Sequence, residues 1–261
     1  MNSLTVVLPA FNEEQDIESL VKRWQQYKDV LSESYGLNLE IVAVNDGSAD
    51  KTKGIAERLE REYENFTLIN HTYNKGLGEA VKTGIGQFLQ NCHDSLYLCI
   101  MDCDNTHDPC YITDMLDLMR ETAADVVIAS RYRKGSRVKG LSGLRLLMSH
   151  GARYVFKLLL NVPGVSDYTC GYRVYRREIL LSAFKRFGSG LVSEKGFCCM
   201  TELLYKLHAC GAVFGEVPFV LRYDLKKGTS KMDVLKTAIN SVRLALRLRE
   251  LKRIKEQPEG F

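Results

Sequence analysis

Residues 96–109 read Leu-Tyr-Leu-Cys-Ile-Met-Asp-Cys-Asp-Asn-Thr-His-Asp-Pro, and the fold and the chemistry of the chain can be argued outward from them. The apolar run 96–101 has the length of a buried β-strand, and two acids, Asp102 and Asp104, follow it directly. On an extended backbone alternate side chains point the same way, so the two carboxylates lie together. Like charges held this close need a cation, or one carboxyl group must stay protonated. The stretch therefore predicts a strand that ends in a site for Mg²⁺ or Mn²⁺, shared with substrate phosphates.

The first half of the chain alternates between short apolar runs and helical patterns. Besides 96–101, the runs 4–8, 39–44, 66–70 and 125–129 are short enough to be strands. We expect one helix from about 13 to 35 and a second that begins after Asp50. A third should end at about 90, and a fourth should span about 110–122. This alternation predicts an α/β fold whose central sheet is mostly parallel and flanked by helices.

Polar segments follow four of the predicted strands, at 9–13, 45–50, 74–78 and 102–108. Ligands of parallel sheets bind beyond the carboxyl ends of the strands, so these segments should converge on one crevice. The pattern favours a nucleotide site. The pair Gly76 and Gly78 lacks the third glycine of the dinucleotide fingerprint and follows the third strand, which argues against a nicotinamide-dependent oxidoreductase.

Charge is distributed unevenly along the sequence. Residues 1–130 carry 10 Lys and Arg against 22 Asp and Glu, whereas residues 131–261 carry 26 against 10. The basic second half is expected to face an anionic partner. The sequence shows neither a signal-peptide pattern nor an apolar run of about eighteen residues, which predicts a cytoplasmic protein without a membrane span. The eight cysteines lack zinc-site or disulfide spacing and are read as reduced thiols.

Four motifs together resemble those of family 2 glycosyltransferases of GT-A fold: Leu8-Pro-Ala-Phe-Asn-Glu-Glu14, Val44-Asn-Asp-Gly-Ser-Ala-Asp50, Asn74-Lys-Gly-Leu-Gly-Glu-Ala80 and Met101-Asp-Cys-Asp104. The resemblance implies a GT-A nucleotide-sugar-binding fold and a metal-dependent, inverting hexosyltransferase. It implies that Asp102 and Asp104 hold the divalent ion on the donor diphosphate. The residues it implies for binding the nucleotide sugar are Pro9, Phe11, Glu13, Asp46, Lys75, Gly76, Asp102, Arg222 and Lys231.

The segment Val165-Ser-Asp-Tyr-Thr-Cys-Gly-Tyr-Arg173 narrows the resemblance to polyprenyl-phosphate glycosyltransferases of the dolichol-phosphate mannose synthase type, over about residues 4–231. This implies an acceptor such as dolichyl or undecaprenyl phosphate, whose phosphate is bound by Arg131, Arg145 and Ser149. Arginine forks suit phosphate oxygens. The resemblance assigns catalytic roles to Asp104, Arg131 and Asp167. A phosphate monoester is largely a dianion at neutral pH, so it can attack the sugar without a general base.

The sequence departs from the family pattern after Asp104. Relatives of this type usually place Gln-His-Pro-Pro there, and the Gln is a third metal ligand in some of them. This chain has Thr106-His107-Asp108-Pro109 instead. Whether Thr106 or His107 replaces the third ligand stays open. Phe11 also stands where Tyr is frequent, which keeps an aromatic ring for stacking on the base.

The predicted organisation is a catalytic domain over 1–225, with a nucleotide-sugar half (1–130) and an acceptor half (131–225). Residues 226–261 form a predicted basic amphipathic helix, with Val242 and Leu246 on one apolar line and Leu244 and Leu248 on a second. Such a helix can lie in the headgroup plane, so we expect peripheral association with the cytosolic face of a membrane. The alternative is a helix that packs on the catalytic domain or on a second subunit.

Other interpretations stay open at this level. A transferase of the same fold could act on a soluble glycan or a glycolipid, and the domain could bind nucleotide sugars without catalysis. A second copy of the chain or a membrane protein is a further candidate partner. Nucleic acid is not an expected partner, because the basic residues alternate with apolar ones. The sequence does not choose between GDP and UDP donors, or between mannose and glucose.

Overall fold

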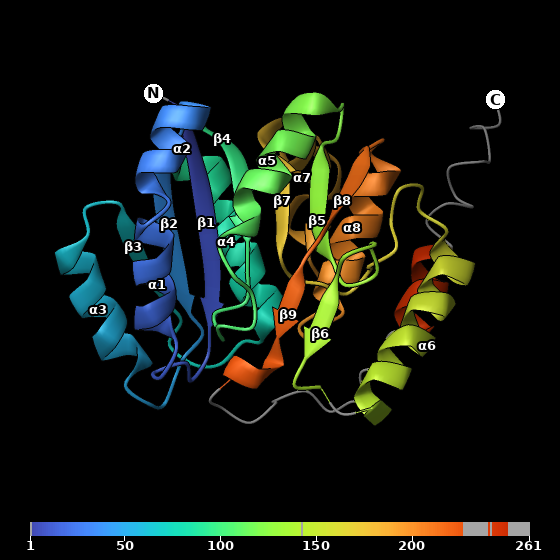
Figure 1. Ribbon diagram of the computed structural model, residues 1–261, viewed down its shortest axis with the longest axis horizontal. Coiled ribbons are helices and arrows are strands. Elements are labelled where there is room, and N and C mark those ends of the chain that lie inside the picture. The colour runs from blue at the N-terminus through green and yellow to red at the C-terminus, as the bar shows by residue number, and fades with distance from the viewer. Residues whose placement is uncertain (1, 142, 227–239, 241, 250–261) are drawn as a thin grey trace.

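The computed structural model describes residues 2–141, 143–226, 240 and 242–249 of the 261-residue chain. A seven-stranded sheet crosses the molecule (Figure 1). Its strands are β1 (Ser3–Ala10), β2 (Asn38–Asn45), β3 (Phe66–Asn70), β4 (Ser95–Ile100), β5 (Val126–Ser130), β7 (Arg173–Arg176) and β8 (Phe214–Pro218). Their order is β3-β2-β1-β4-β7-β5-β8, and every neighbouring pair is parallel except the two pairs made by β7.

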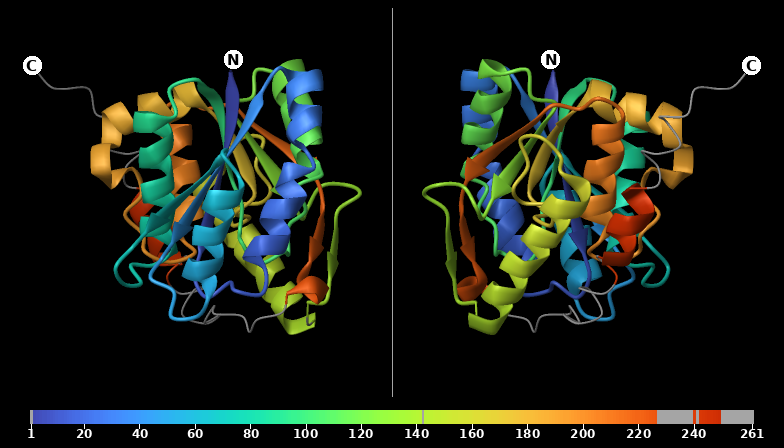
Figure 2. Two further views of the ribbon diagram at one scale, coloured as in Figure 1. Left: turned by 90° about the vertical axis from the view of Figure 1, so that its left-hand side faces the viewer. Right: turned by 90° about the vertical axis from the view of Figure 1, so that its right-hand side faces the viewer.

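Helices cover both faces of this sheet. Figure 2 shows α1 (Ile17–Gln25), α2 (Lys28–Tyr35) and α5 (Tyr111–Glu121) on one face, and α4 (Leu77–Asn91), α7 (Arg177–Phe187) and α8 (Cys199–Ala209) on the other. In Figure 1, α3 (Thr52–Glu62) stands at the β3 edge and α6 (Gly143–Leu160) at the opposite edge. Two short 3₁₀ turns, η1 (Gly188–Leu191) and η2 (Tyr223–Leu225), complete these elements.

The core forms where these layers meet. Every residue of β1 is buried, as expected for a central parallel strand covered on both faces. In α1 the buried residues Ile17, Leu20, Val21 and Trp24 recur at intervals of three and four, which places one apolar stripe against the sheet. The charged residues of this helix lie on its other side.

Strand β7 is antiparallel to both of its neighbours, β4 and β5. It therefore starts at the edge of the sheet where β4 and β5 end. The segment that leads into β7, residues 166–172, is thus brought between the loop after β4 and the loop after β5. This one antiparallel strand joins the motif around Asp167 to the acidic motif at Asp102 and Asp104.

A second, two-stranded parallel sheet pairs β6 (Arg137–Lys139) with β9 (Val220–Arg222). It lies on the α1 and α5 side of the molecule (Figure 2). At the end of β9, the backbone N–H of Arg222 donates to the carbonyl of Thr106 at 2.9 Å. Strand β9 is thereby attached to the loop that follows β4.

The predicted α/β architecture with a mostly parallel sheet is confirmed, as are all five strands expected in residues 1–130. The single helix expected from 13 to 35 is wrong in detail, because it is divided into α1 and α2. Between them Gln26 and Tyr27 donate to carbonyls three residues back, on Arg23 and Trp24, which tightens the chain into a turn. No strand was anticipated in residues 131–225, where β6 to β9 lie.

Most of the segment predicted as a basic amphipathic helix, residues 226–261, lies outside the described residues. Within it, 242–249 are helical. Leu244 and Leu248 are buried in the core, whereas Val242 and Leu246 are exposed. One apolar line thus packs on the domain, as the alternative interpretation required, and the other stays accessible. None of the helices in the described residues has both the length and the apolar character needed to cross a bilayer.

Candidate active site

The loop after β4 holds Asp104 in an ionised state. Its Oδ1 accepts hydrogen bonds from the backbone N–H (3.2 Å) and the hydroxyl (2.6 Å) of Thr106, and its Oδ2 accepts one from the Lys226 ammonium. Burial by itself raises the pKa of Asp104, but the positive charge of Lys226, the nearby His107 and the hydrogen bonds from Lys226 and Thr106 together outweigh this effect. The pKa of Asp104 therefore lies below its ordinary value.

The same loop contains a backbone conformation that is uncommon for residues other than glycine, at Asn105 with φ of 58°. Helix α1 fixes it. The Nδ2 of Asn105 donates to Asp16 Oδ1 and to Ser19 Oγ, both at 2.8 Å. Arg23 donates to Asn105 Oδ1 at 2.6 Å and to Asp108 Oδ2 at 3.0 Å. The acidic loop is therefore held in place by the helix that follows β1.

Asp102 differs from Asp104, since 35% of its side chain is exposed. The loss of hydration around it raises its pKa, while the nearby ring of His107 acts in the opposite direction. A Cβ atom at Gly171 would lie 2.8 Å from Asp102 Oδ1, so a larger residue at this position would displace the carboxylate. The two acids thus have pKa values displaced in opposite directions.

The acidic pair suits a divalent ion. Among the described residues no three His, Cys, Asp or Glu side chains form a complete metal-binding set. Two carboxylates are nevertheless sufficient for Mg²⁺ or Mn²⁺ when substrate phosphates and water complete the coordination. Asp102 and Asp104 would hold such an ion, which would neutralise charge on a leaving diphosphate. The Thr106 hydroxyl donates to Asp104, whereas Nδ1 of the buried His107 has no hydrogen-bond partner in the described parts of the chain.

The loops after β2 and β3 are joined by Asp46, which is buried. Its Oδ1 accepts from the backbone N–H of Lys75 at 2.9 Å and contacts His71 Nδ1 at 2.7 Å, and its Oδ2 accepts from the N–H of Gly76 at 2.8 Å. The carboxylate is thus an anchor of the loop that contains Lys75 and Gly76. The structure thus brings together Asp46, Lys75 and Gly76, three of the residues predicted to bind the nucleotide sugar.

The loop after β1 continues this surface. Pro9 is buried within β1, and Phe11 and Glu13 are half-buried just beyond its end. Between them, Asn12 has a positive φ of 54°, and its Oδ1 accepts from the N–H of Ala49 at 2.9 Å. The predicted donor residues of the first and second loops are therefore neighbours.

A loop before α8 packs against the loop that contains Gly76. Gly76 has φ of 97°, and a Cβ there would lie 2.5 Å from the carbonyl oxygen of Lys195. The loop is fixed by the buried Glu202, whose Oε2 accepts from the N–H groups of Ser193 (2.8 Å) and Glu194 (2.7 Å). Glu202, to which the sequence assigned no role, thus positions the loop that lies against Gly76.

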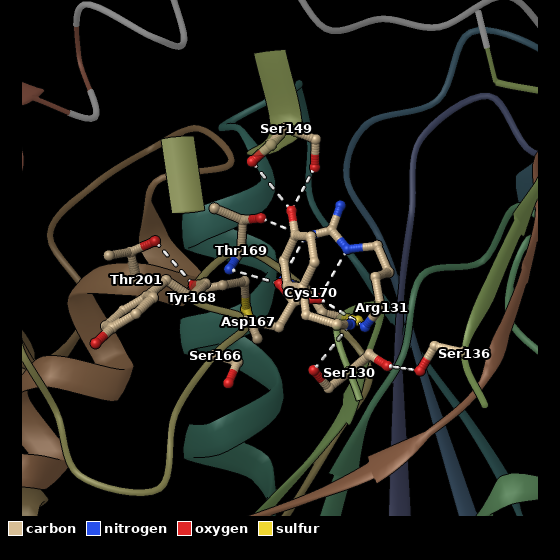
Figure 3. Close-up of polar contacts among 12 residues, drawn as sticks. Ser130, Arg131, Ser136, Ser149, Ser166, Asp167, Tyr168, Thr169, Cys170 and Thr201 are labelled. Atoms are coloured by element: carbon tan, nitrogen blue, oxygen red, sulfur yellow. Dashed lines mark hydrogen bonds and ion pairs between the residues drawn. The ribbon is translucent and has the colours of Figure 1, made fainter. Parts of the chain in front are cut away.

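The loop after β5 contributes one partner of a buried ion pair. Arg131 is only 16% exposed and pairs with the fully buried Asp167. Its Nε donates to Asp167 Oδ2 at 2.7 Å and its Nη2 to Asp167 Oδ1 at 2.6 Å, while Nη2 also donates to Thr169 Oγ1 at 2.5 Å. Burial raises the pKa of Asp167, but the adjacent guanidinium outweighs burial, and the net pKa is below its ordinary value. Asp167 therefore acts by positioning Arg131 (Figure 3).

The segment that carries Asp167 is itself anchored by a buried acid on β8. Glu216 Oε1 accepts from the N–H groups of Ser166 and Asp167, each at 2.7 Å. Burial raises the pKa of Glu216. The chain of contacts thus runs from Glu216 through Asp167 to Arg131.

Helix α6 contacts the loop after β5. Ser149 is joined to Tyr132, whose hydroxyl lies 2.7 Å from Ser149 Oγ and donates to its carbonyl at 3.0 Å. Figure 3 shows Ser149 beside the cluster of Arg131, Asp167 and Thr169, to which Tyr132 connects it. Arg145 is on the same helix, one turn before Ser149, and its side chain lies outside the described part of the molecule.

Two further predicted donor residues are separate from these clusters. Arg222 is partly exposed and forms an ion pair with Asp224 at 2.9 Å, so only its backbone N–H reaches the acidic loop, at Thr106. Lys231 lies outside the described residues.

Comparison with known proteins decides the family. The sequence profile described as Glycosyl transferase family 2 matches residues 5–183, more than half of the chain. The chain belongs to glycosyltransferase family 2. It is a sugar transferase, and the family that the four motifs indicated is confirmed.

Two curated proteins are similar in sequence to this family 2 glycosyltransferase. It is 30% identical over 228 residues to the polyprenol monophosphomannose synthase of Mycolicibacterium smegmatis, covering 87% of this chain and 80% of that protein. It is also 30% identical over 230 residues to the dolichol-phosphate mannosyltransferase of Pyrococcus furiosus, covering 88% of this chain and 59% of that protein.

The fold of the family 2 glycosyltransferase is GT-A-like, as predicted. Its structure resembles that of a mannosyltransferase from Pyrobaculum calidifontis in complex with GDP-Man and Mn²⁺, with a TM-score of 0.58 and 16% identity. The match covers 98% of this chain and 65% of that protein. At this identity the likeness concerns the fold alone.

Some residues of the site had no signal in the sequence of this family 2 glycosyltransferase. Lys226 contacts Asp104, but it is one of many basic residues in its segment. Gly171 was visible within the quoted motif, yet its contact with Asp102 depends on the antiparallel strand β7. Glu216 follows no motif and is recognised only by the two N–H groups it accepts from.

Proposed function

We propose that this family 2 glycosyltransferase moves a hexose from a nucleotide sugar to a polyprenyl phosphate, with inversion and with a divalent ion. One observation carries the proposal: the short segment 167–171 contacts both an acidic and a basic residue. Gly171 lies against Asp102, and four residues earlier Asp167 anchors Arg131. A donor diphosphate bound through a metal on the acidic side would therefore present its sugar to an acceptor phosphate on the basic side. The names of the two curated relatives favour mannose and a polyprenyl phosphate.

The donor would be bound by residues 1–130. The ring of Phe11 would stack on the base, with Pro9 and Glu13 beside it, and the loop anchored by Asp46 would present Lys75 to the phosphates. Asp102 and Asp104 would hold Mg²⁺ or Mn²⁺ against the diphosphate. Arg222 and Lys231 are proposed to lie near the same diphosphate.

The acceptor would be bound by residues 131–225. Arg131, Arg145 and Ser149 are proposed to hold its phosphate. A phosphate oxygen attacks the anomeric carbon, a new C–O bond forms on one face, and the C–O bond to the donor diphosphate breaks on the other. Because the phosphate monoester is already largely a dianion, no side chain has to remove a proton from it.

The acceptor lipid is proposed to be met at a membrane surface, on the cytosolic face. Residues 1–225 would form the catalytic unit and residues 226–261 the basic segment that attracts anionic lipid. The exposed Val242 and Leu246 are the described part of that segment available for such contact.

The test is a donor panel assayed with a short polyprenyl phosphate. GDP-mannose, GDP-glucose, UDP-mannose and UDP-glucose would each be offered with and without Mn²⁺. We expect transfer of one hexose to the lipid phosphate, lost in D102A and D104A and retained in D114A, an exposed acid on α5. Transfer to soluble glycans with no turnover of any lipid phosphate would contradict the proposal. An unchanged rate in D102A and D104A would contradict the proposed metal role.

A further inference from the structure

Arg153 lies on α6 four residues after Ser149, so the two side chains project from one face of the helix. Its guanidinium carbon is 4.5 Å from the centre of the Tyr132 ring. The guanidinium carbon of Arg131 is 5.5 Å from the centre of the same ring, and the hydroxyl of that ring is 2.7 Å from Ser149 Oγ. Tyr132 therefore contacts both arginines and Ser149.

The two arginines differ in how their charge is compensated. Arg131 is paired with Asp167 through Nε and Nη2, so this buried pair carries no net charge. Arg153 has no Asp or Glu oxygen within 4.0 Å among the described residues. Its Nε is buried and donates to no acceptor in the described parts of the chain. A buried donor of this kind is costly unless an acceptor satisfies it.

The groups around Arg153 indicate which kind of hydrogen-bond acceptor would bind to it. The contacts within reach are a guanidinium edge, a phenol hydroxyl and a serine hydroxyl. Stacking on Tyr132 fixes the guanidinium plane while its edge keeps its N–H donors. Such an edge binds two oxygens of one phosphate group.

We propose that Arg153, held by Tyr132, binds the phosphate of the acceptor and supplies the positive charge that Arg131 does not contribute. This rests on the proposed function. A phosphate dianion carries two negative charges, the Arg131–Asp167 pair is neutral and Arg145 contributes one positive charge, so Arg153 would supply the second. Arg153 is thus a residue that discriminates a lipid phosphate from the corresponding alcohol.

The test combines binding and kinetics on the intact chain. R153Q removes the charge, R153K keeps a charge without the planar fork, and Y132L removes the stacking ring. The matched control is K157Q, because Lys157 is an exposed basic residue one turn further along α6. Thermal melting of each variant comes first. If R153Q does not fold, R153K and Y132L address the same contact.

In R153Q we expect the KM for a short polyprenyl phosphate to rise about tenfold or more, with the KM for the donor changed less than about twofold. Inorganic phosphate should compete with the lipid, and its inhibition constant should rise in parallel. Y132L should show the same selective loss, R153K an intermediate one, and K157Q none. Equal acceptor KM values in R153Q and wild type, or equal changes in both KM values, would overturn the proposal.

Direct titration separates this inference from the proposed function. The short polyprenyl phosphate and inorganic phosphate would each be titrated into wild type and R153Q by calorimetry, without donor. If wild type binds the lipid phosphate more tightly than R153Q but transfers nothing to it, the reaction fails and the binding residue stands. If wild type and R153Q bind both probes equally, the role of Arg153 is refuted whatever the reaction.

Discussion

Replacing Asp167 by Asn should destabilise the fold strongly. The Asp167 carboxylate is fully buried and accepts three hydrogen bonds from Arg131, at 2.6, 2.7 and 3.0 Å. It also accepts from the N–H groups of Thr169 and Cys170. Asn keeps one carbonyl oxygen as an acceptor but replaces the other with an NH2 group, which cannot accept a hydrogen bond from Arg131. It also leaves the positive charge of the guanidinium uncompensated. Breaking a buried ion pair in this way costs about 3–5 kcal/mol.

For a chain of this size such a loss corresponds to a fall in Tm of about 6–20 °C, at about 2–4 °C per kcal/mol. The assay is thermal and urea unfolding of D167N and wild type at neutral pH. D224N is the matched control, because the Arg222–Asp224 pair is exposed on both sides and such surface pairs contribute about 0–1 kcal/mol. A D167N variant as stable as D224N would refute the reasoning that Arg131 depends on this carboxylate.

Three further outcomes follow from the same geometry. In EDTA, D102N should raise Tm, because burial disfavours the ionised form of Asp102 and raises its pKa. D104N should lower Tm, because Lys226 favours the ionised form of Asp104. Equal Tm shifts in the two variants would contradict this assignment. G171A should weaken Mn²⁺ binding about tenfold or more, since its Cβ would displace Asp102, and calorimetry showing unchanged Mn²⁺ affinity would rule out that contact. Folding lowers the pKa of Asp167, so this carboxylate stabilises the fold fully at pH values well above its unfolded pKa of about 3.9, and the stabilisation is lost as the pH falls below that value. The Tm difference between wild type and D167N should therefore stay constant from pH 8 to 5 and shrink below pH 4.

The positions of the residues proposed to bind the donor could be predicted because these residues follow strands. Asp46 and Asp102 come at the ends of apolar runs, and parallel strands end at one edge of a sheet. What the sequence did not indicate is how Asp46 is used. Its oxygens accept from the loop that holds Lys75 and Gly76, a contact between residues about thirty positions apart.

The acceptor half was less predictable for a topological reason. Strand β7 is short, contains Arg173 and Arg176 and has no turn-flanked apolar run, so nothing marked it as a strand. Yet its insertion between β4 and β5 brings Asp167 to Arg131 and Gly171 to Asp102. Such contacts depend on strand order, which local patterns do not specify.

The most direct test of the central claim is the product formed from a nucleotide-linked mannose and a short lipid acceptor in the presence of Mn²⁺. Mass spectrometry would compare the polyprenyl phosphate with the corresponding polyprenol. We predict that one hexose is added to the phosphate and none to the alcohol. Addition to the alcohol, or no addition to the phosphate from any mannose or glucose donor, would contradict the account.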